Sequence, residues 1–140
     1  MKKVLKIRIK NDIKQLADVT EATSVFYRKW QIPERVASSI DLALDEIINN
    51  IILYGYQDFG EHYIDVSIYF EKNYAVVEIV DDGREFNPLD VPIPDMTSEI
   101  EERPVGGLGI HLVRNMMDEI KYDRKEDKNY IFLKKKVLEV

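Results

Sequence analysis

The stretch Gly106-Gly107-Leu108-Gly109-Ile110 is the most informative part of this 140-residue sequence. Three of its first four residues are glycines, and an apolar helical pattern follows at Leu112, Val113, Met116 and Met117. Glycine lets backbone N–H groups approach an anion closely, and a helix N-terminus carries the positive end of the helix dipole. The stretch therefore predicts an anion-binding helix start. On this motif alone, a glycine-rich helix start without a ligand is the alternative.

Length and composition limit the class of protein. We expect a single domain over residues 1–140, long enough for a substantial core. The net charge of −6 argues against direct binding of nucleic acid, which needs a basic surface. Cysteine is absent, which excludes disulfides and thiolate metal sites. No apolar run reaches membrane-spanning length and the first ten residues do not resemble a signal peptide, so we expect a cytoplasmic protein without a membrane partner.

The hydrophobic pattern predicts an α+β fold. Asn11 or Asp12 is a candidate N-cap for a first helix, while Pro33 and Gly55 mark the two ends of a second. A third helix is expected at about residues 108–117, and strands at about residues 4–9, 64–70, 74–80, 120–122 and 130–137. This order predicts a two-layer sandwich, in which one antiparallel or mixed, mainly antiparallel sheet carries its helices on one face.

A long loop interrupts this pattern between the strand that ends near residue 80 and the glycine-rich stretch. Residues 84–105 contain four of the five prolines, namely Pro88, Pro92, Pro94 and Pro104. A loop of this length inside a compact domain is usually functional or disordered.

Glu46 and Asn50 lie four residues apart on the second predicted helix and therefore share one face. A carboxylate can accept a proton from a nucleophile, and an amide oxygen can bind a hard cation such as Mg²⁺. Asp45 and Asn49 form a competing pair one residue earlier, and a plain solvated face is a further alternative. Spacing alone does not choose among these.

Asp81-Asp82-Gly83 follows a buried-strand pattern. A carboxylate at a strand end can accept a hydrogen bond from an exocyclic amine such as that of adenine, and glycine lets a flat ring approach the backbone. An ordinary Asp-Gly turn is the alternative, and either aspartate fits the chemistry. No P-loop or Rossmann pattern occurs, and His62 and His111 lack ligand spacing, so we expect both histidines at the surface or partly packed.

Three motifs together resemble one family. Residues 46–50 (Glu-Ile-Ile-Asn-Asn) resemble the N box of the GHKL, or Bergerat-fold, ATP-binding superfamily. Residues 81–83 resemble its Asp-x-Gly adenine box, and residues 106–109 its second glycine box. Their order and separation agree over essentially the whole chain. Within the superfamily, this short form is similar to the anti-sigma-factor serine kinases, the switch-protein kinases of bacterial stress and sporulation control.

The resemblance implies a role for each residue that the motifs contain. It implies that Glu46 is the general base, that Asn50 is the Mg²⁺ ligand and that Asp81 accepts from adenine. It further implies that residues 84–105 form an ATP lid. The remaining cofactor-binding positions that it implies are Gly83 against adenine and, at the phosphates, Gly106, Gly107, Leu108 and Gly109. Two positions depart from the family pattern, Glu85 in place of a frequent second glycine and Tyr54 in place of a frequent histidine.

The function that the resemblance implies is transfer of the ATP γ-phosphoryl group to a serine or threonine of a small antagonist protein, together with sequestration of a regulatory partner such as a sigma factor. The alternative is a nucleotide-gated binding module without kinase activity. Glu46 favours the kinase, since a pure binding module needs no base. A histidine-kinase catalytic domain is a third possibility, weakened here because no upstream helix with a phospho-accepting histidine precedes the domain.

The related kinases imply a homodimer to which the N-terminal elements contribute. These elements are rich in apolar groups (Ile7, Ile9, Phe26, Tyr27, Trp30) and in basic groups (Lys6, Arg8, Lys10, Arg28, Lys29). The apolar groups are expected to be core in part. The basic groups are either a surface for an acidic partner or a plain solvated face.

Overall fold

The computed structural model describes residues 3–87, 90 and 107–137. The chain begins with β1 (Val4–Lys10), the 3-10 helix η1 (Ile13–Gln15), α1 (Leu16–Trp30) and α2 (Glu34–Tyr54). It continues with β2 (Tyr63–Glu71), β3 (Tyr74–Asp81), α3 (Gly107–Met116), β4 (Glu119–Lys125) and β5 (Lys128–Lys136). Among these described helices, none combines the length and the apolar character that a membrane span requires.

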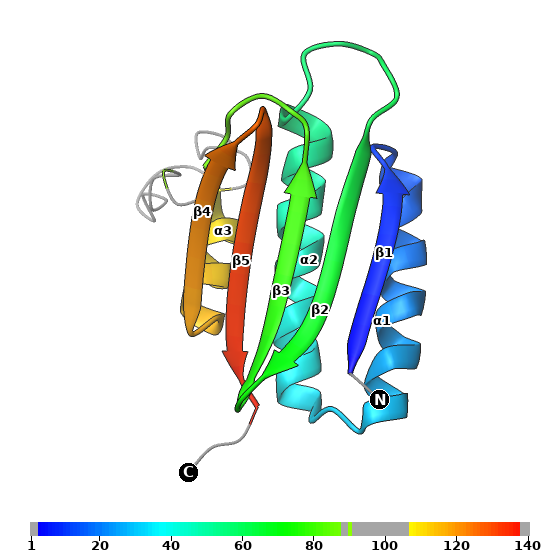
Figure 1. Cartoon of the computed structure of the whole chain (residues 1–140), viewed down its shortest axis with the longest axis vertical. Coiled ribbons are helices and arrows are strands. Elements are labelled where there is room, and N and C mark those ends of the chain that lie inside the picture. Colours follow the sequence, from blue (N-terminus) through cyan, green and yellow to red (C-terminus); the bar gives the residue numbers. More distant parts are fainter. Residues whose placement is uncertain (1–2, 88–89, 91–106, 138–140) are drawn as a thin grey trace.

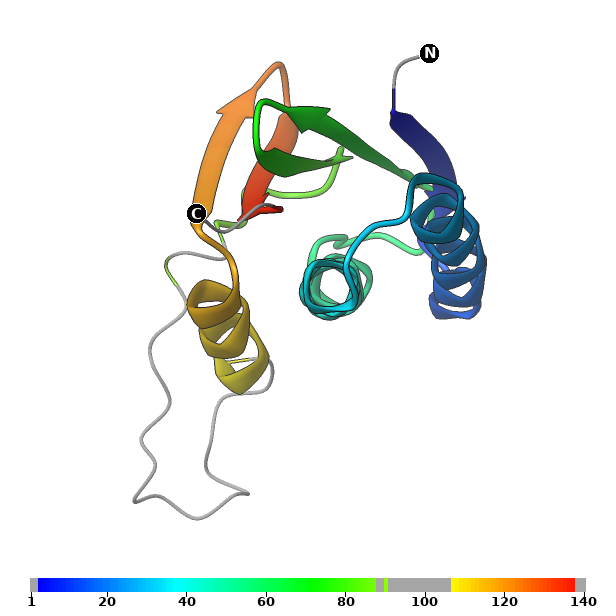
Figure 2. The same cartoon turned by 90° about the horizontal axis from the view of Figure 1, so that it is seen from below.

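The strands form one five-stranded sheet in the order β1-β2-β3-β5-β4 (Figure 1). All four pairings are antiparallel. Of the antiparallel and mixed sheets that the sequence allowed, the protein therefore has the antiparallel one. The three α-helices lie on one face of this sheet, as Figure 2 shows from below. The predicted α+β sandwich, with helices on one face, is confirmed.

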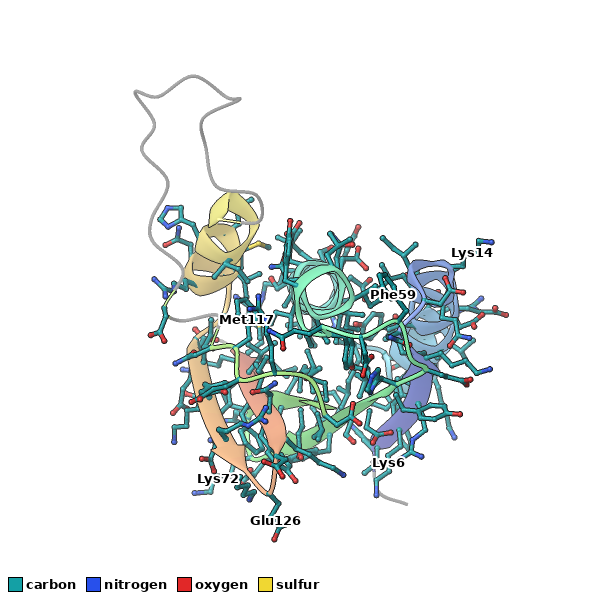
Figure 3. The ribbon with its side chains drawn as sticks, turned by 90° about the horizontal axis from the view of Figure 1, so that it is seen from above. Lys6, Lys14, Phe59, Lys72, Met117 and Glu126 are labelled. Carbon is teal, nitrogen blue, oxygen red and sulfur yellow. The ribbon has the colours of Figure 1, made fainter. Side chains whose placement is uncertain are left out.

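Alternation along the strands explains which face of the sheet the helices cover. In β2, the buried residues Ile64, Val66 and Ile68 point toward the helices and alternate with more exposed positions. In Figure 3, Lys6 of β1 lies on the other side of the sheet, away from the helices. The sheet therefore has one packed face and one open face.

The helix α2 carries the largest apolar stripe of the protein. Its residues Val36, Ile40, Leu44, Ile47 and Ile51 are 0–2% exposed and pack against the inner face of the sheet. Such a stripe at three- and four-residue spacing holds a helix in one rotational setting. On either side of this stripe, Asp41 faces α1 and Glu46 faces α3.

The start of the first helix differs in detail from its prediction. Asp12 caps the 3-10 helix η1, where its side chain accepts from the backbone N–H of Lys14 at 3.0 Å, and α1 begins only at Leu16. Asn11 instead ties the end of β1 to the loop that precedes β2. Its side chain accepts from the backbone N–H of His62 at 3.0 Å and donates to the carbonyl of Gly60 at 3.2 Å.

Candidate functional site

Asp81 ends β3 with its carboxylate on the helix-covered side of the sheet, 3% exposed. One oxygen, Oδ1, accepts from the backbone N–H of Gly83 at 2.8 Å and from Nδ2 of Asn129 at 3.0 Å. No described group donates to the other oxygen, Oδ2. Burial raises the pKa of Asp81, against the opposing effect of the two hydrogen bonds. The carboxylate therefore has one fixed oxygen and one available acceptor.

Asp82, the competing aspartate, lies in a different environment. Its side chain is 47% exposed, and its carboxylate faces Nδ1 of His62 at 3.2 Å. The two neighbours diverge because successive side chains of an extended segment point to opposite faces. Of the two, only Asp81 presents a buried acceptor to the layer between sheet and helices.

Gly83 stands where the turn after β3 touches the end of α2. A Cβ at this position would lie 2.5 Å from the carbonyl oxygen of Gly55 and 2.9 Å from Oδ1 of Asp81. The first of these atoms belongs to the backbone and cannot easily move aside. Close packing of two backbone segments thus requires glycine here, in addition to the ligand contact that the sequence suggested.

Asn129, at the start of β5, is a site residue that the sequence analysis missed. It is 2% exposed and lies opposite Asp81 in the β3–β5 register. Its Nδ2 donates to Oδ1 of Asp81 and, at 2.7 Å, to the carbonyl of Arg84, while its Oδ1 accepts from the hydroxyl of Tyr122 at 2.6 Å. Asn129 therefore fixes both the Asp81 carboxylate and the chain that follows it. Only the strand register could have revealed this pairing.

Two arginines add further anchors to the same turn. Arg124 of β4 donates to the carbonyl of Gly83 at 2.7 Å. Arg84 donates through Nε to the carbonyl of Tyr54 at 2.7 Å, and its backbone N–H donates to the carbonyl of Gly55 at 2.7 Å. The turn is thus held between the β4–β5 hairpin and the C-terminal end of α2.

Glu46 projects from α2 toward the first turn of α3. A Cβ built on Gly109 would overlap the Glu46 carboxylate, so the carboxylate lies directly against this glycine. The helix α3 begins at Gly107, so the carboxylate stands beside its N-terminal turn. A helix N-terminus favours negative charge, and a bound phosphate at this point would lie within reach of Glu46.

Asp45, the competing carboxylate, lies on another side of α2. Asp41, one turn before Asp45, accepts from the hydroxyls of Tyr27 at 2.8 Å and Thr23 at 3.2 Å, both on α1. Partial desolvation and the neighbouring Asp41 charge raise the pKa of Asp45. Asp45 therefore belongs to the α1 side of α2, whereas Glu46 belongs to the α3 side.

Asn50 lies one turn after Glu46 and is 4% exposed. Its amide makes no hydrogen bond to any group within the described residues. An amide oxygen that has no partner in the protein suits a hard cation. The described residues contain no group of three or more His, Cys, Asp or Glu able to hold a metal, so a cation here would take most of its ligands from a bound phosphate and water.

Part of the predicted site lies outside the described residues. Gly106 lies outside them, and so does most of the predicted lid, namely residues 88–89 and 91–105. Gly107 and Leu108 form the first residues of α3. Figure 1 shows that β3 ends toward the same end of the molecule as α2, the helix that carries Glu46 and Asn50, and Gly109 of α3 lies against Glu46.

The basic groups of the N-terminal elements do not form one surface. Arg8 makes a two-pronged ion pair with Asp65, at 2.7 and 3.1 Å, and Lys10 pairs with Glu61 at 3.0 Å. These side chains lie on the open face of the sheet, whereas α1, which carries Arg28 and Lys29, lies on the packed face (Figure 2). Most of the apolar groups in question are core: Ile9, Phe26 and Tyr27 are buried, and Ile7 and Trp30 pack against them.

Comparison with known proteins gives three findings. The family profile described as the histidine kinase-like ATPase domain matches residues 9–135. The serine/threonine-protein kinase BtrW of Bordetella bronchiseptica is 23% identical over 99 residues, which cover 71% of this chain and 70% of BtrW. The crystal structure of the RsbU and RsbW domains of Rv1364c from Mycobacterium tuberculosis superposes with a TM-score of 0.66 at 12% identity, over 96% of this chain. The match covers 32% of that longer chain, and at this identity the likeness concerns the fold alone.

Proposed function

This chain belongs to the histidine kinase-like ATPase family, the GHKL superfamily, and from that membership we propose that it is an ATP-dependent protein serine/threonine kinase of the anti-sigma-factor type. The observation that carries the proposal is the Asp81 carboxylate, buried at the end of β3 with one oxygen fixed and the other available. The likeness to BtrW, itself named a serine/threonine-protein kinase, supports the reaction class.

Adenine is proposed to bind against Asp81. Its exocyclic amine would donate to Oδ2, because Oδ1 is already occupied by Gly83 and Asn129. The Asp81 carboxylate is buried, and burial raises its pKa. A neutral donor such as the amine of a base reaches Oδ2 without bringing a second charge out of water.

The phosphates are proposed to bind between Asn50 and the start of α3. Bound Mg²⁺ would neutralise phosphate charge and orient the γ-phosphoryl group. Asn50 fits as its protein ligand, because its amide oxygen suits a hard cation and makes no hydrogen bond within the described residues. The backbone N–H groups at the first turn of α3, from Gly107 onward, would meet the phosphate oxygens.

Glu46 is proposed as the general base. In the reaction, the hydroxyl oxygen of the substrate serine or threonine bonds to the γ-phosphorus while the bond from that phosphorus to the β,γ-bridging oxygen breaks. The hydroxyl proton passes to the Glu46 carboxylate, and ADP leaves. Glu46 lies against Gly109 in the first turn of α3, whereas Asp45 lies on the α1 side of α2. This position supports Glu46 over Asp45 as the base.

The partners are proposed at a coarser level. We propose a small antagonist protein as substrate and a sigma factor as the sequestered partner, in a cytoplasmic homodimer built from one 140-residue domain per copy. The ion pairs of Arg8 and Lys10 reduce the basic surface available to an acidic partner, so the N-terminal strand is a weaker candidate for that contact than its charge count suggested.

Incubation with radiolabelled ATP, Mg²⁺ and candidate antagonist proteins from the same genome tests the proposal. A phosphorylated serine or threonine on one of these proteins is the expected result. Binding of ATP with no transfer to any candidate would support the nucleotide-gated binding module instead. A protein that binds no ATP at all would overturn both.

A further inference from the structure

His62, just before β2, stands between two carboxylates. Its Nε2 lies 2.7 Å from Oδ1 of Asp58, and its Nδ1 lies 3.2 Å from Oδ1 and 3.4 Å from Oδ2 of Asp82. Asp58 belongs to the loop between α2 and β2, and Asp82 belongs to the turn that follows Asp81. The His62 side chain, 20% exposed, therefore bridges that loop to the proposed adenine-binding turn.

The arrangement suits a protonated imidazole. A neutral imidazole has one N–H and one bare nitrogen, and an ionised carboxylate only accepts. A neutral His62 would therefore donate to one aspartate and direct a lone pair at the other. Only the imidazolium donates to both at once. The hydrogen bond to Asp58 is the main cause that raises the pKa of His62, and the same bond is the main cause that lowers the pKa of Asp58.

The ring of Tyr56 fixes the orientation of the imidazole. The two rings stack with centroids 4.3 Å apart and an interplanar angle of 14°. An aromatic face favours a cation over a neutral ring. The Tyr56 hydroxyl is buried and has no partner within the described part of the chain, and burial raises the pKa of the phenol, which stays neutral.

The backbone around His62 is held independently of its protonation. Asn11 bonds the backbone of His62 and of Gly60, and the Asp58 side chain accepts from the backbone N–H of Gly60 at 3.0 Å. The loop side of the bridge is therefore firmly placed. The Asp82 side depends on the imidazole, because the Asp82 carboxylate makes no other described hydrogen bond or ion pair.

We propose that His62 is a positioning residue for the nucleotide, which in its protonated form holds Asp82 and thereby the Asp81–Gly83 turn in the ATP-binding setting. The inference rests on the proposed function. Loss of the proton from His62 leaves the Asp82 charge uncompensated beside Asp81. ATP, itself an anion, then meets a more negative and less firmly held turn. Affinity for ATP accordingly falls as pH rises.

The groups that face His62 set the pH range of this effect. They are Asp58 from the loop, Asp82 from the turn after β3, and Tyr56 from the segment after α2. Since the folded-state pKa of His62 is raised, the bridge is complete below the ordinary value of about 6.5 and is lost as pH rises through the higher folded value.

The experiment compares ATP affinity at pH 6 and pH 8.5 in wild type and His62→Gln, by calorimetry with Mg²⁺ present. Glutamine keeps a hydrogen-bonding group but does not titrate. The phosphates of ATP titrate equally for both proteins, so the ratio of the two dissociation constants isolates His62. We expect this ratio to change by about two- to fivefold over the range, the size of effect that an exposed ion pair carries.

Two further variants keep the test decisive. Glu61→Gln is the matched control, because it removes the adjacent ion pair with Lys10 and should follow the wild-type pH dependence. Asp82→Asn keeps His62 and should lose the same pH dependence as His62→Gln, which guards against a variant that simply misfolds. The chain has two histidines, so in NMR titrations the resonance that His62→Gln removes belongs to His62. Asp82→Asn should lower the pKa of His62.

The outcomes separate this inference from the proposed function. If all proteins bind ATP and the ratio stays constant with pH, His62 has no positioning role and only the further inference fails. If an NMR titration finds His62 coupled to Asp82 but wild type binds no ATP, the proposed function fails and the inference falls with it.

Discussion

Replacement of Asn129 by alanine tests the architecture of the site. The asparagine joins three segments through three short hydrogen bonds: to Asp81 at 3.0 Å, to the carbonyl of Arg84 at 2.7 Å and from Tyr122 at 2.6 Å. A fourth contact, from the backbone N–H of Phe86 at 3.4 Å, is long enough to be neglected. Alanine removes all of them and leaves Asp81 with one donor.

The expected loss can be worked out from these contacts. A typical hydrogen bond contributes about 1 kcal/mol net, so three of them give a loss of roughly 3 kcal/mol in the free energy of unfolding. This is a large share of the roughly 5–15 kcal/mol that stabilises a domain. Tyr122→Phe removes only one of the three bonds and should cost about 1 kcal/mol, which makes it the matched control.

Urea unfolding at pH 7, followed by circular dichroism, measures both variants. Similar slopes with a clearly lower midpoint for Asn129→Ala than for Tyr122→Phe are expected. Asn129→Asp adds a distinct signature, because a second carboxylate beside Asp81 resists ionisation, and this variant should regain stability at acidic pH. If Asn129→Ala costs no more than Tyr122→Phe, the three-way connection is not what holds the turn.

Two further predictions concern the phosphate end of the site. Glu46→Ala should keep ATP affinity but reduce phosphoryl transfer by roughly 10²–10⁴-fold, while Asp45→Ala should leave transfer near wild type. The opposite pattern in a radiolabel transfer assay would identify Asp45 as the general base. Asn50→Ala should weaken the Mg²⁺-dependent part of ATP binding. EDTA should therefore lower the ATP affinity of wild type strongly and that of this variant little. Asn49→Ala is the control, and an equal EDTA response in all three proteins would exclude Asn50 as the metal ligand.

The sequence predicted the order of elements because its periodicities are strong. The stripe from Val36 to Ile51 permits only a helix, and the alternation from Ile64 to Phe70 permits only a strand. The terminal details were less accessible. Asp12 caps a 3-10 turn rather than α1, because the choice between 3-10 and α geometry in a first turn depends on where the neighbouring chain lies.

The site was predictable at its motifs but not at its supports. Spacing alone left Glu46 and Asp45 equivalent, and only the packing of α2 between α1 and α3 separates their environments. Asn129 and His62 carried no local signal, since one depends on the β3–β5 register and the other on how a loop closes. Such contacts join residues far apart in the chain, and a single sequence does not show which distant residues come into contact.

The central claim is that the buried Asp81 carboxylate binds the adenine of ATP, and calorimetric titration of wild type and Asp81→Asn with ATP and Mg²⁺ tests it most directly. In the variant, Gly83 and Asn129 hold the amide oxygen, so the NH₂ group takes the place of Oδ2 and opposes the adenine amine. Affinity should fall roughly ten- to hundredfold, as expected for loss of a hydrogen bond to a charged group.

Stability supplies the control for that titration. Burial raises the pKa of Asp81, so the folded protein favours the protonated carboxyl group. The stability that this provides is fully present below about pH 3.9 and is lost as pH rises through the higher folded-state pKa. Asp81→Asn should therefore unfold in urea at pH 7 no more easily than wild type. A folded variant with much weaker ATP binding is the predicted result. Equal ATP affinity in the two folded proteins would contradict the account.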